Sequence, residues 1–260
     1  MSISRALGSA LAGLLTLTLL AAPAWPAELT ALVAGAVRDV VKDLADEHAR
    51  ATGVKADLIF GAMGPLKARI AAGERVDLVI LTPVVFTELI ESGKLQVKYR
   101  APLGRVGVGV AVKKGAPHPD LGSVDSFRRA LLATPSLLYG DPKATSSGAY
   151  FATVIERLGV GDQLRAKTRT FPDGHAEMAY LGTSKGAALG VTQISEILAN
   201  LSAGVELAGP FPPGLQHHTV YEAAVPSNAP SPEQAEALFE RLVAKPAQAR
   251  FRALGFEPVE

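Results

Sequence analysis

The chain has 260 residues, a net charge of +1, and 48% hydrophobic against 20% charged residues. This balance is typical of a globular protein, and the near-neutral charge gives no reason to expect binding to nucleic acid or to an anionic membrane. There are no cysteines, which excludes disulfides, thiolate catalysis and cysteine-ligated metal sites. The length suits one large domain or two small lobes.

The first 27 residues, Met1 to Ala27, read as a secretory signal. Arg5 supplies a positive start, and the stretch from Ala6 to Ala22 is almost wholly apolar or small. Small residues at Ala24 and Ala27 offer two cleavage points, so we expect a mature protein exported to the periplasm. An uncleaved membrane anchor is the alternative, but no basic flank follows the apolar run.

From Glu28 on, short apolar runs alternate with stretches of helical period, which is typical of a parallel sheet covered by helices. Gly53 is placed to end the first helix, and Pro65 fits the first turn of the second. The elements expected up to residue 91 are a strand at Glu28–Ala34, a helix at Val37–Ala51, a strand at Val54–Phe60, a helix at 65–72, a strand at Val76–Leu81 and a helix at Val84–Glu91.

The rhythm then breaks at an extended, glycine-containing stretch, Val106–Lys113, and a second extended stretch follows much later at Gln216–Val225. Between them the α/β rhythm restarts, and two helices close the chain. The elements expected here are helices at Val124–Ala133, Ser147–Leu158, Ala176–Thr183, Ile194–Asn200, Ser231–Ala244 and Pro246–Leu254, and strands at Ser136–Tyr139, Lys167–Phe171 and Ala187–Val191.

Two α/β units joined by two extended segments predict a chain that crosses between two lobes twice. We therefore expect a signal at 1–27, a discontinuous first lobe from 28–103 plus 227–260, and a second lobe with the hinge strands at 104–226. Sheets of this kind bind ligands where loops leave the carboxyl ends of the strands, so the site is expected in the cleft between the lobes.

Several segments resemble the periplasmic molybdate- and tungstate-binding proteins of ABC transporters, a type II solute-binding family. They include Leu32–Asp39, Phe60–Gly64, Asp141–Tyr150 and Lys185–Val191, in the family's order. The resemblance implies two α/β lobes, each with a mixed or parallel sheet flanked by helices, that close about two hinge crossovers. It also implies an anionic ligand and a membrane permease and ATPase as partners.

The resemblance further indicates where the ligand would lie. The candidate ligand-binding residues are Gly35, Ala36, Arg38, Ala62, Met63, Gly64, Ser146, Ser147, His175 and Gln193. At Ala36, Met63 and Gln193 this chain lacks hydroxyl groups that the family usually offers to a tetrahedral oxyanion. Each lost donor would cost about 1–3 kcal/mol, so a small organic di- or tricarboxylate is preferred over molybdate, which stays as the alternative.

Two candidates carry charge arguments of their own. Arg38 lies in the first turn of a helix, where a cation opposes the helix dipole, unless it meets an anion. His175 opens another expected helix, where it could donate to a carboxylate. Ser146 or Ser147 is expected to cap the helix that follows them.

His217 and His218 point to opposite faces of a strand, so no metal site is expected there.

None of the common catalytic motifs is present: no nucleophile elbow, Walker loop or paired metal histidines. The sequence therefore predicts a monomeric solute-binding protein of an ABC-type importer, without a cofactor and without enzymatic activity. A ligand sensor that does not transport is a second possibility. An enzyme on the same scaffold is the third, because Asp141 and Glu177 could serve as acids or bases but lack a clear partner.

Overall fold

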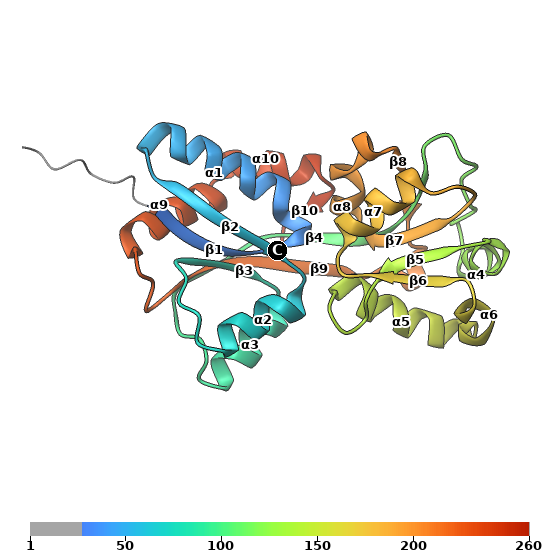
Figure 1. Cartoon of the computed structure of the whole chain (residues 1–260), viewed down its shortest axis with the longest axis horizontal. Coiled ribbons are helices and arrows are strands. Elements are labelled where there is room, and N and C mark those ends of the chain that lie inside the picture. Colours follow the sequence, from blue (N-terminus) through green and yellow to red (C-terminus); the bar gives the residue numbers. More distant parts are fainter. Residues whose placement is uncertain (1–27, 260) are drawn as a thin grey trace, which may run out of the picture.

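The computed structural model describes residues 28–259, so the predicted signal lies outside the described part of the chain. Ten strands form one continuous sheet, and helices cover both of its faces (Figure 1). The strands are β1 (Glu28–Ala34), β2 (Lys55–Gly61), β3 (Leu78–Leu81), β4 (Val97–Lys113), β5 (Leu137–Gly140), β6 (Thr168–Phe171), β7 (Leu189–Gln193), β8 (Val205–Pro210), β9 (His218–Pro226) and β10 (Phe256–Glu257).

The helices follow the expected order, with one helix, α6, that was not predicted. They are α1 (Arg38–Thr52), α2 (Met63–Ala71), α3 (Pro83–Glu91), α4 (Val124–Ala133), α5 (Ser146–Leu158), α6 (Gly161–Arg165), α7 (Gly174–Thr183), α8 (Ile194–Ala199), α9 (Pro232–Val243) and α10 (Lys245–Ala253). Short 3₁₀ turns lie at Gly35–Val37, Leu201–Ala203 and Pro213–Leu215. Within residues 28–259, no helix combines the length and the apolar character needed to cross a bilayer.

The sheet is two lobes joined by long strands, which confirms the expected fold class. In the first lobe β2, β1 and β3 are parallel, and in the second β6, β5 and β7 are parallel. Strand β4 runs through both, pairing with β9 in the first lobe and with β7 and β8 in the second. Figure 1 shows β4 and β9 crossing the middle of the molecule side by side, with α1, α9 and α10 on one face of the first lobe and α2 and α3 on the other.

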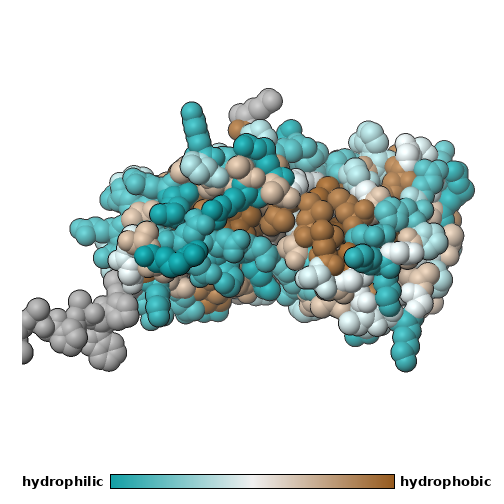
Figure 2. All heavy atoms as spheres, turned by 90° about the horizontal axis from the view of Figure 1, so that it is seen from above, coloured by the Kyte–Doolittle hydropathy of each residue, from teal (hydrophilic) through white to brown (hydrophobic). Residues whose placement is uncertain are grey.

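Separate apolar cores stabilise the two lobes. The first core draws on both ends of the chain, because Leu238 and Phe251 from α9 and α10 are fully buried with residues of β1 and β3. Along β4 the core changes between Val106 and Val108: Val106 belongs to the first core and Val108 to a core of the second lobe. On the face shown in Figure 2, apolar residues are exposed near the middle of the molecule.

Several elements differ from the expected ones for identifiable reasons. The first helix starts with a 3₁₀ turn at Gly35–Val37, and α2 begins at Met63, which puts Pro65 third in the helix. Strand β4 begins at Val97, nine residues earlier than expected, because its first part, from Val97 to Gly107, pairs with β9. Strand β8 was not predicted, since its six residues carry no clear alternation and are paired only with distant β4.

The glycines of β4 permit close packing, a role that the sequence pattern did not predict. A Cβ atom placed on Gly109 would lie 2.8 Å from Ile194 Cγ1 and 3.0 Å from Leu207 Cδ1. Helix α8 and strand β8 therefore approach β4 more closely than any side chain there would allow. At Gly109 the structure thus shows a packing requirement.

Replacing Gly109 with alanine should destabilise the protein by about 1–3 kcal/mol, because the added methyl overpacks a filled interior. Urea unfolding would measure the change. The control is Gly161→Ala at the start of α6, where the nearest atom would lie 3.6 Å from the new Cβ, an ordinary contact distance. Equal stability of the two variants would contradict the packing role of Gly109.

A buried carboxyl group lies in the second lobe at Glu177 of α7. Its side chain is 0% exposed, Oε1 accepts a hydrogen bond from the Val191 amide at 2.7 Å, and Oε2 has no partner among the described residues. Burial, and secondly the nearby carboxylate of Glu196, raises the pKa of Glu177 well above its ordinary value. The folded protein therefore keeps this group protonated at pH values where the unfolded chain ionises it.

This difference predicts how stability depends on pH. Between the unfolded pKa, about 4.3, and the raised folded pKa, the folded state binds more protons than the unfolded state, so this group's contribution to stability falls as pH rises. Glu177→Gln does not titrate, so its stability advantage over wild type should grow from about pH 4.5 upward. Urea unfolding at several pH values measures this, with the exposed Glu156→Gln of α5 as control. A difference that stays constant with pH would contradict it.

Candidate functional site

A narrow cavity lies between the lobes, where the carboxyl ends of parallel strands from both lobes meet. Residues at or just after the ends of β1, β2, β5, β6 and β7 contribute to it, as expected for folds of this kind. Its lining residues are Ala34, Gly35, Ala36, Gly61, Ala62, Met63, Thr145, Ser146, Ser147, Asp173, Gln193, Glu196 and Tyr221.

The two lobes touch each other at the rim of this cavity. The Gly64 amide donates to the Ala144 carbonyl at 3.1 Å, and His175 Nε2 lies 3.1 Å from the Gly35 carbonyl oxygen. A Cβ on Gly64 would come within 3.2 Å of the Lys143 carbonyl oxygen. The lobes are therefore closed, and the space left for water-sized molecules is only ≈ 20 Å³.

Seven of the ten candidate residues from the sequence line the cavity: Gly35, Ala36, Ala62, Met63, Ser146, Ser147 and Gln193. The other three, Arg38, Gly64 and His175, do not line it. Gly64 forms the contact between the lobes described above. The remaining two have their polar groups directed elsewhere.

Arg38 starts α1, but its guanidinium lies over the ring of Phe60, 4.9 Å from the ring centroid. Its Nε is buried and has no hydrogen-bond partner in the described part of the chain. Because a cation in the first turn opposes the helix dipole, we expected an anion beside Arg38. In the structure an aromatic face takes that place beside the guanidinium, through a cation–π contact.

His175 uses both ring nitrogens within the protein. A carbonyl oxygen can only accept, so Nε2 carries the proton and donates to Gly35. The other nitrogen, Nδ1, accepts from Asn200 Nδ2 at 2.9 Å, and the same amide group donates to the Glu196 carbonyl oxygen at 2.7 Å. The expected donation from His175 to a ligand is replaced by a link between the lobes.

The cavity offers neutral hydrogen-bonding groups. Gln193 is 2% exposed, and its Nε2 donates to Thr219 Oγ1 at 3.0 Å, while its Oε1 has no partner among residues 28–259. Ser147 and Tyr221 add buried hydroxyls. Burial raises the pKa of Tyr221 above its ordinary value, so the phenol stays neutral and can donate to an anion.

Helix starts add main-chain donors. At the start of α2 the Gly64 amide donates to Ala144, Pro65 has no N–H and the Leu66 amide donates to Ala62, so of its first four residues only Met63 has an amide that can face a ligand. At α5, Thr145 is the capping residue: its Oγ1 accepts from the Gly148 amide at 3.1 Å. This corrects the expectation that Ser146 or Ser147 caps the helix, and both serines lie inside its first turn.

Two carboxyl groups also line the cavity, at Asp173 and Glu196. Asp173 caps α7 through the Ala176 amide at 2.8 Å. Glu196 is 6% exposed and accepts from Thr192 Oγ1 at 2.5 Å, and burial raises its pKa above the ordinary value. No arginine or lysine is among the lining residues of the described chain. The site therefore surrounds a ligand with neutral donors and two acids.

Sequence reasoning missed Tyr221, Asp173 and Glu196. Tyr221 lies on the second crossover strand, and a crossover strand has to pass under the cleft between the lobes. A polar side chain on that strand could therefore have been predicted as a ligand-binding residue. Asp173 and Glu196 follow the ends of β6 and β7, where the carboxyl-end rule places ligand sites. No group of three or more potential metal ligands occurs within residues 28–259.

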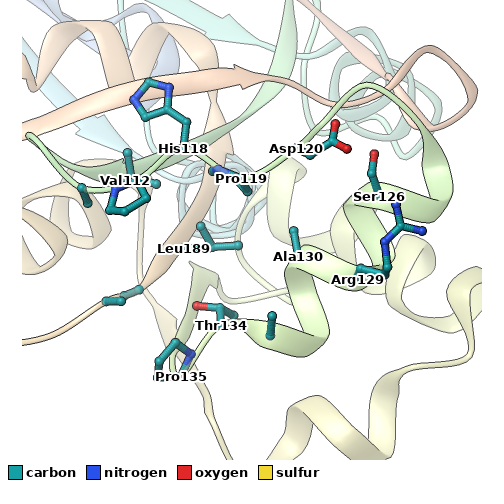
Figure 3. Close-up of a pocket in the computed structure, with 15 residues that line it drawn as sticks. Val112, His118, Pro119, Asp120, Ser126, Arg129, Ala130, Thr134, Pro135 and Leu189 are labelled. Atoms are coloured by element: carbon teal, nitrogen blue, oxygen red, sulfur yellow. The ribbon is translucent and has the colours of Figure 1, made fainter.

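A larger cavity of ≈ 470 Å³ lies in the second lobe alone (Figure 3). Val112 of β4, the segment from Ala116 to Asp120, α4 and Leu189 form its mostly apolar walls. A molecule there would touch no residue of the first lobe. Such a molecule could not favour closure by contacting both lobes. We therefore take the cavity between the lobes as the functional site.

Solved structures share this two-lobed fold. The periplasmic molybdate-binding protein of Azotobacter vinelandii superposes with a TM-score of 0.75 at 18% identity, covering 89% of this chain and all of that one. The sulfate-binding protein SubI from Mycobacterium tuberculosis H37Rv gives a TM-score of 0.65 at 17% identity, covering 90% of this chain and 88% of that one. At such identities the likeness establishes the fold and leaves the ligand open.

Sequence comparison adds a relative with a different description. A protein named aconitate isomerase, from a Pseudomonas species, is 32% identical over 238 residues, which cover 89% of this chain and 88% of that protein. The family model described as bacterial extracellular solute-binding protein matches residues 29–257, nearly all of the described chain. This chain belongs to that family of bacterial extracellular solute-binding proteins.

Proposed function

We propose that this protein is an exported solute-binding protein whose lobes close on a small organic polycarboxylate, with aconitate as the reference ligand. The observation that carries the proposal is the interlobe cavity itself, where donors from both lobes and from a crossover strand converge. A ligand that contacts both lobes favours the closed form, which is how a two-lobed protein couples binding to a change of shape.

The chemistry of the lining supports a carboxylate. Buried hydroxyls at Ser147 and Tyr221, the amide of Gln193 and the Met63 amide at the start of α2 are donors suited to carboxylate oxygens. The relative at 32% identity carries the name of a tricarboxylate, which makes aconitate the first compound to test.

A tetrahedral oxyanion is the alternative that the small closed cavity favours. Against it, Met63 and Ala36 occupy positions where the resemblance to molybdate-binding proteins implies serine hydroxyls. A six-carbon ligand, in turn, requires the lobes to rotate apart about β4 and β9 before they close on it.

We propose an ABC-type permease and ATPase as the partners that receive the closed protein.

Thermal unfolding with added anions tests the ligand class. A ligand at about 100 times its dissociation constant stabilises the folded state by roughly 2.7 kcal/mol, so cis- or trans-aconitate should raise the melting temperature clearly. Molybdate, tungstate and sulfate should not. A shift with an oxyanion and none with any di- or tricarboxylate would reverse the proposal in favour of the alternative.

Tyr221→Phe tests the site, because it removes one hydroxyl donor and leaves the ring in place. Calorimetry should show aconitate binding weakened by about tenfold to a hundredfold, the equivalent of roughly 1.4–2.8 kcal/mol. Tyr99→Phe, a half-buried tyrosine on β4 in the first lobe, is the matched control. Arg38→Ala should weaken binding less than Tyr221→Phe, since the guanidinium lies over Phe60. Unchanged affinity in Tyr221→Phe would contradict this placement of the ligand.

A further inference from the structure

A carboxyl group in the wall of an anion site needs an explanation beyond binding. Glu196 lines the interlobe cavity and is 6% exposed. An ionised carboxylate beside a bound polycarboxylate would repel it, at a cost that grows with burial. A protein that only binds such a ligand is better served by a neutral amide at this position.

The fold nevertheless leaves a space shaped for this carboxyl group. A Cβ on Gly35 would lie 3.2 Å from Glu196 Oε1, and a Cβ on Gly174 would overlap with both Glu196 Oε2 and Thr192 Oγ1. Gly35 belongs to the first lobe and Gly174 to the second, so the carboxyl group lies between main-chain segments of opposite lobes. Any larger residue at Gly174 would displace it.

Hydrogen bonds fix the orientation of the group within this space. Thr192 Oγ1 donates to Glu196 Oε2, and Asn200 holds the Glu196 main-chain carbonyl. Asn200 also orients His175, which donates across to the Gly35 carbonyl of the first lobe. Closure of the lobes thus places the Gly35 segment beside the Glu196 carboxyl group. A carboxyl group held so firmly at a ligand cavity has the properties of an acid–base residue.

We propose that Glu196 is a catalytic residue that moves a proton within a bound unsaturated polycarboxylate such as aconitate, so that the same cleft isomerises its ligand. This rests on the proposed polycarboxylate site. Burial raises the pKa of Glu196, which brings the group closer to the range in which it both accepts and returns a proton.

The step balances without a co-reactant. The Glu196 carboxylate takes a proton from the CH₂ carbon next to the double bond, and the electron pair of that C–H bond shifts the double bond by one carbon. The resulting allylic negative charge spreads onto the substrate carboxylates. Tyr221 and Gln193 donate hydrogen bonds to these carboxylates or orient them. The Glu196 carboxylic acid then returns the proton to the former vinylic carbon. The old double bond is now single, so the cis and trans forms interconvert.

Proton NMR of aconitate incubated with the mature protein in D₂O tests the proposal. We expect wild type to convert one isomer into the other with deuterium entering the CH₂ group, and Glu196→Gln to slow this by about 10²- to 10⁴-fold. Calorimetry of the same samples should show that Glu196→Gln still binds aconitate. The matched control is Glu177→Gln, a buried glutamate of the same lobe that does not line the cavity; it should keep the activity.

The outcomes separate the two claims. Binding without conversion by wild type would overturn the isomerase and leave the binding function standing. Failure of wild type to bind any tricarboxylate would overturn both. Full conversion by Glu196→Gln, or loss of conversion only in Asp173→Asn, would show that Glu196 is not the proton-transferring residue. Circular dichroism and melting temperature establish that each variant is folded.

Discussion

The pairing of β4 with β9 is the constraint on which the arrangement of the site depends. The two antiparallel strands are paired from Val97 with Pro226 to Gly107 with His218, and β4 then continues into the second lobe. Because hydrogen-bonded strands cannot slide without breaking their register, this ladder fixes where the parallel strands of each lobe end. All cavity-lining residues except Tyr221 come from segments at or after those ends, and Tyr221 comes from the ladder itself.

Closure brings together groups that are far apart in sequence, and main-chain atoms make the contacts. The Gly64 amide meets the Ala144 carbonyl, and the Gly35 carbonyl accepts from His175. Inside this frame the side chains are neutral donors plus two acids, with no lysine or arginine among the lining residues of the described chain. Such a lining relies on hydrogen-bond geometry more than on net charge, which makes the site sensitive to the shape of its ligand.

The fold class could be predicted from the sequence because it depends on local periodicity. The alternation of apolar runs with helices, and the two extended stretches, predicted two lobes and two crossovers. The division at 103/104 and 226/227 stays a prediction, although the apolar cores change between Val106 and Val108. Helix ends at Gly53 and Gly159 follow directly from glycine in the left-handed region. Strand β8 was not predicted from the sequence, because it pairs with a strand about a hundred residues away.

The site was predicted less completely, because its chemistry depends on long-range contacts. The main-chain positions Gly35, Ala36, Ala62 and Met63 follow strand ends and line the cavity as expected. The orientation of a long side chain does not follow from its place in a helix, so Arg38 was expected at the ligand but lies over Phe60.

The glycine at position 64 has a consequence for how such a protein can change its ligand. Its amide and the Ala144 carbonyl set the distance between the lobes at the rim, and neither group belongs to a side chain. Residues inside the cavity can therefore be exchanged by mutation while the rim keeps its spacing. Selectivity and closure are then separately adjustable. A designer could vary positions 36, 63 and 193 to change the preferred ligand while the protein still closes to the same shape.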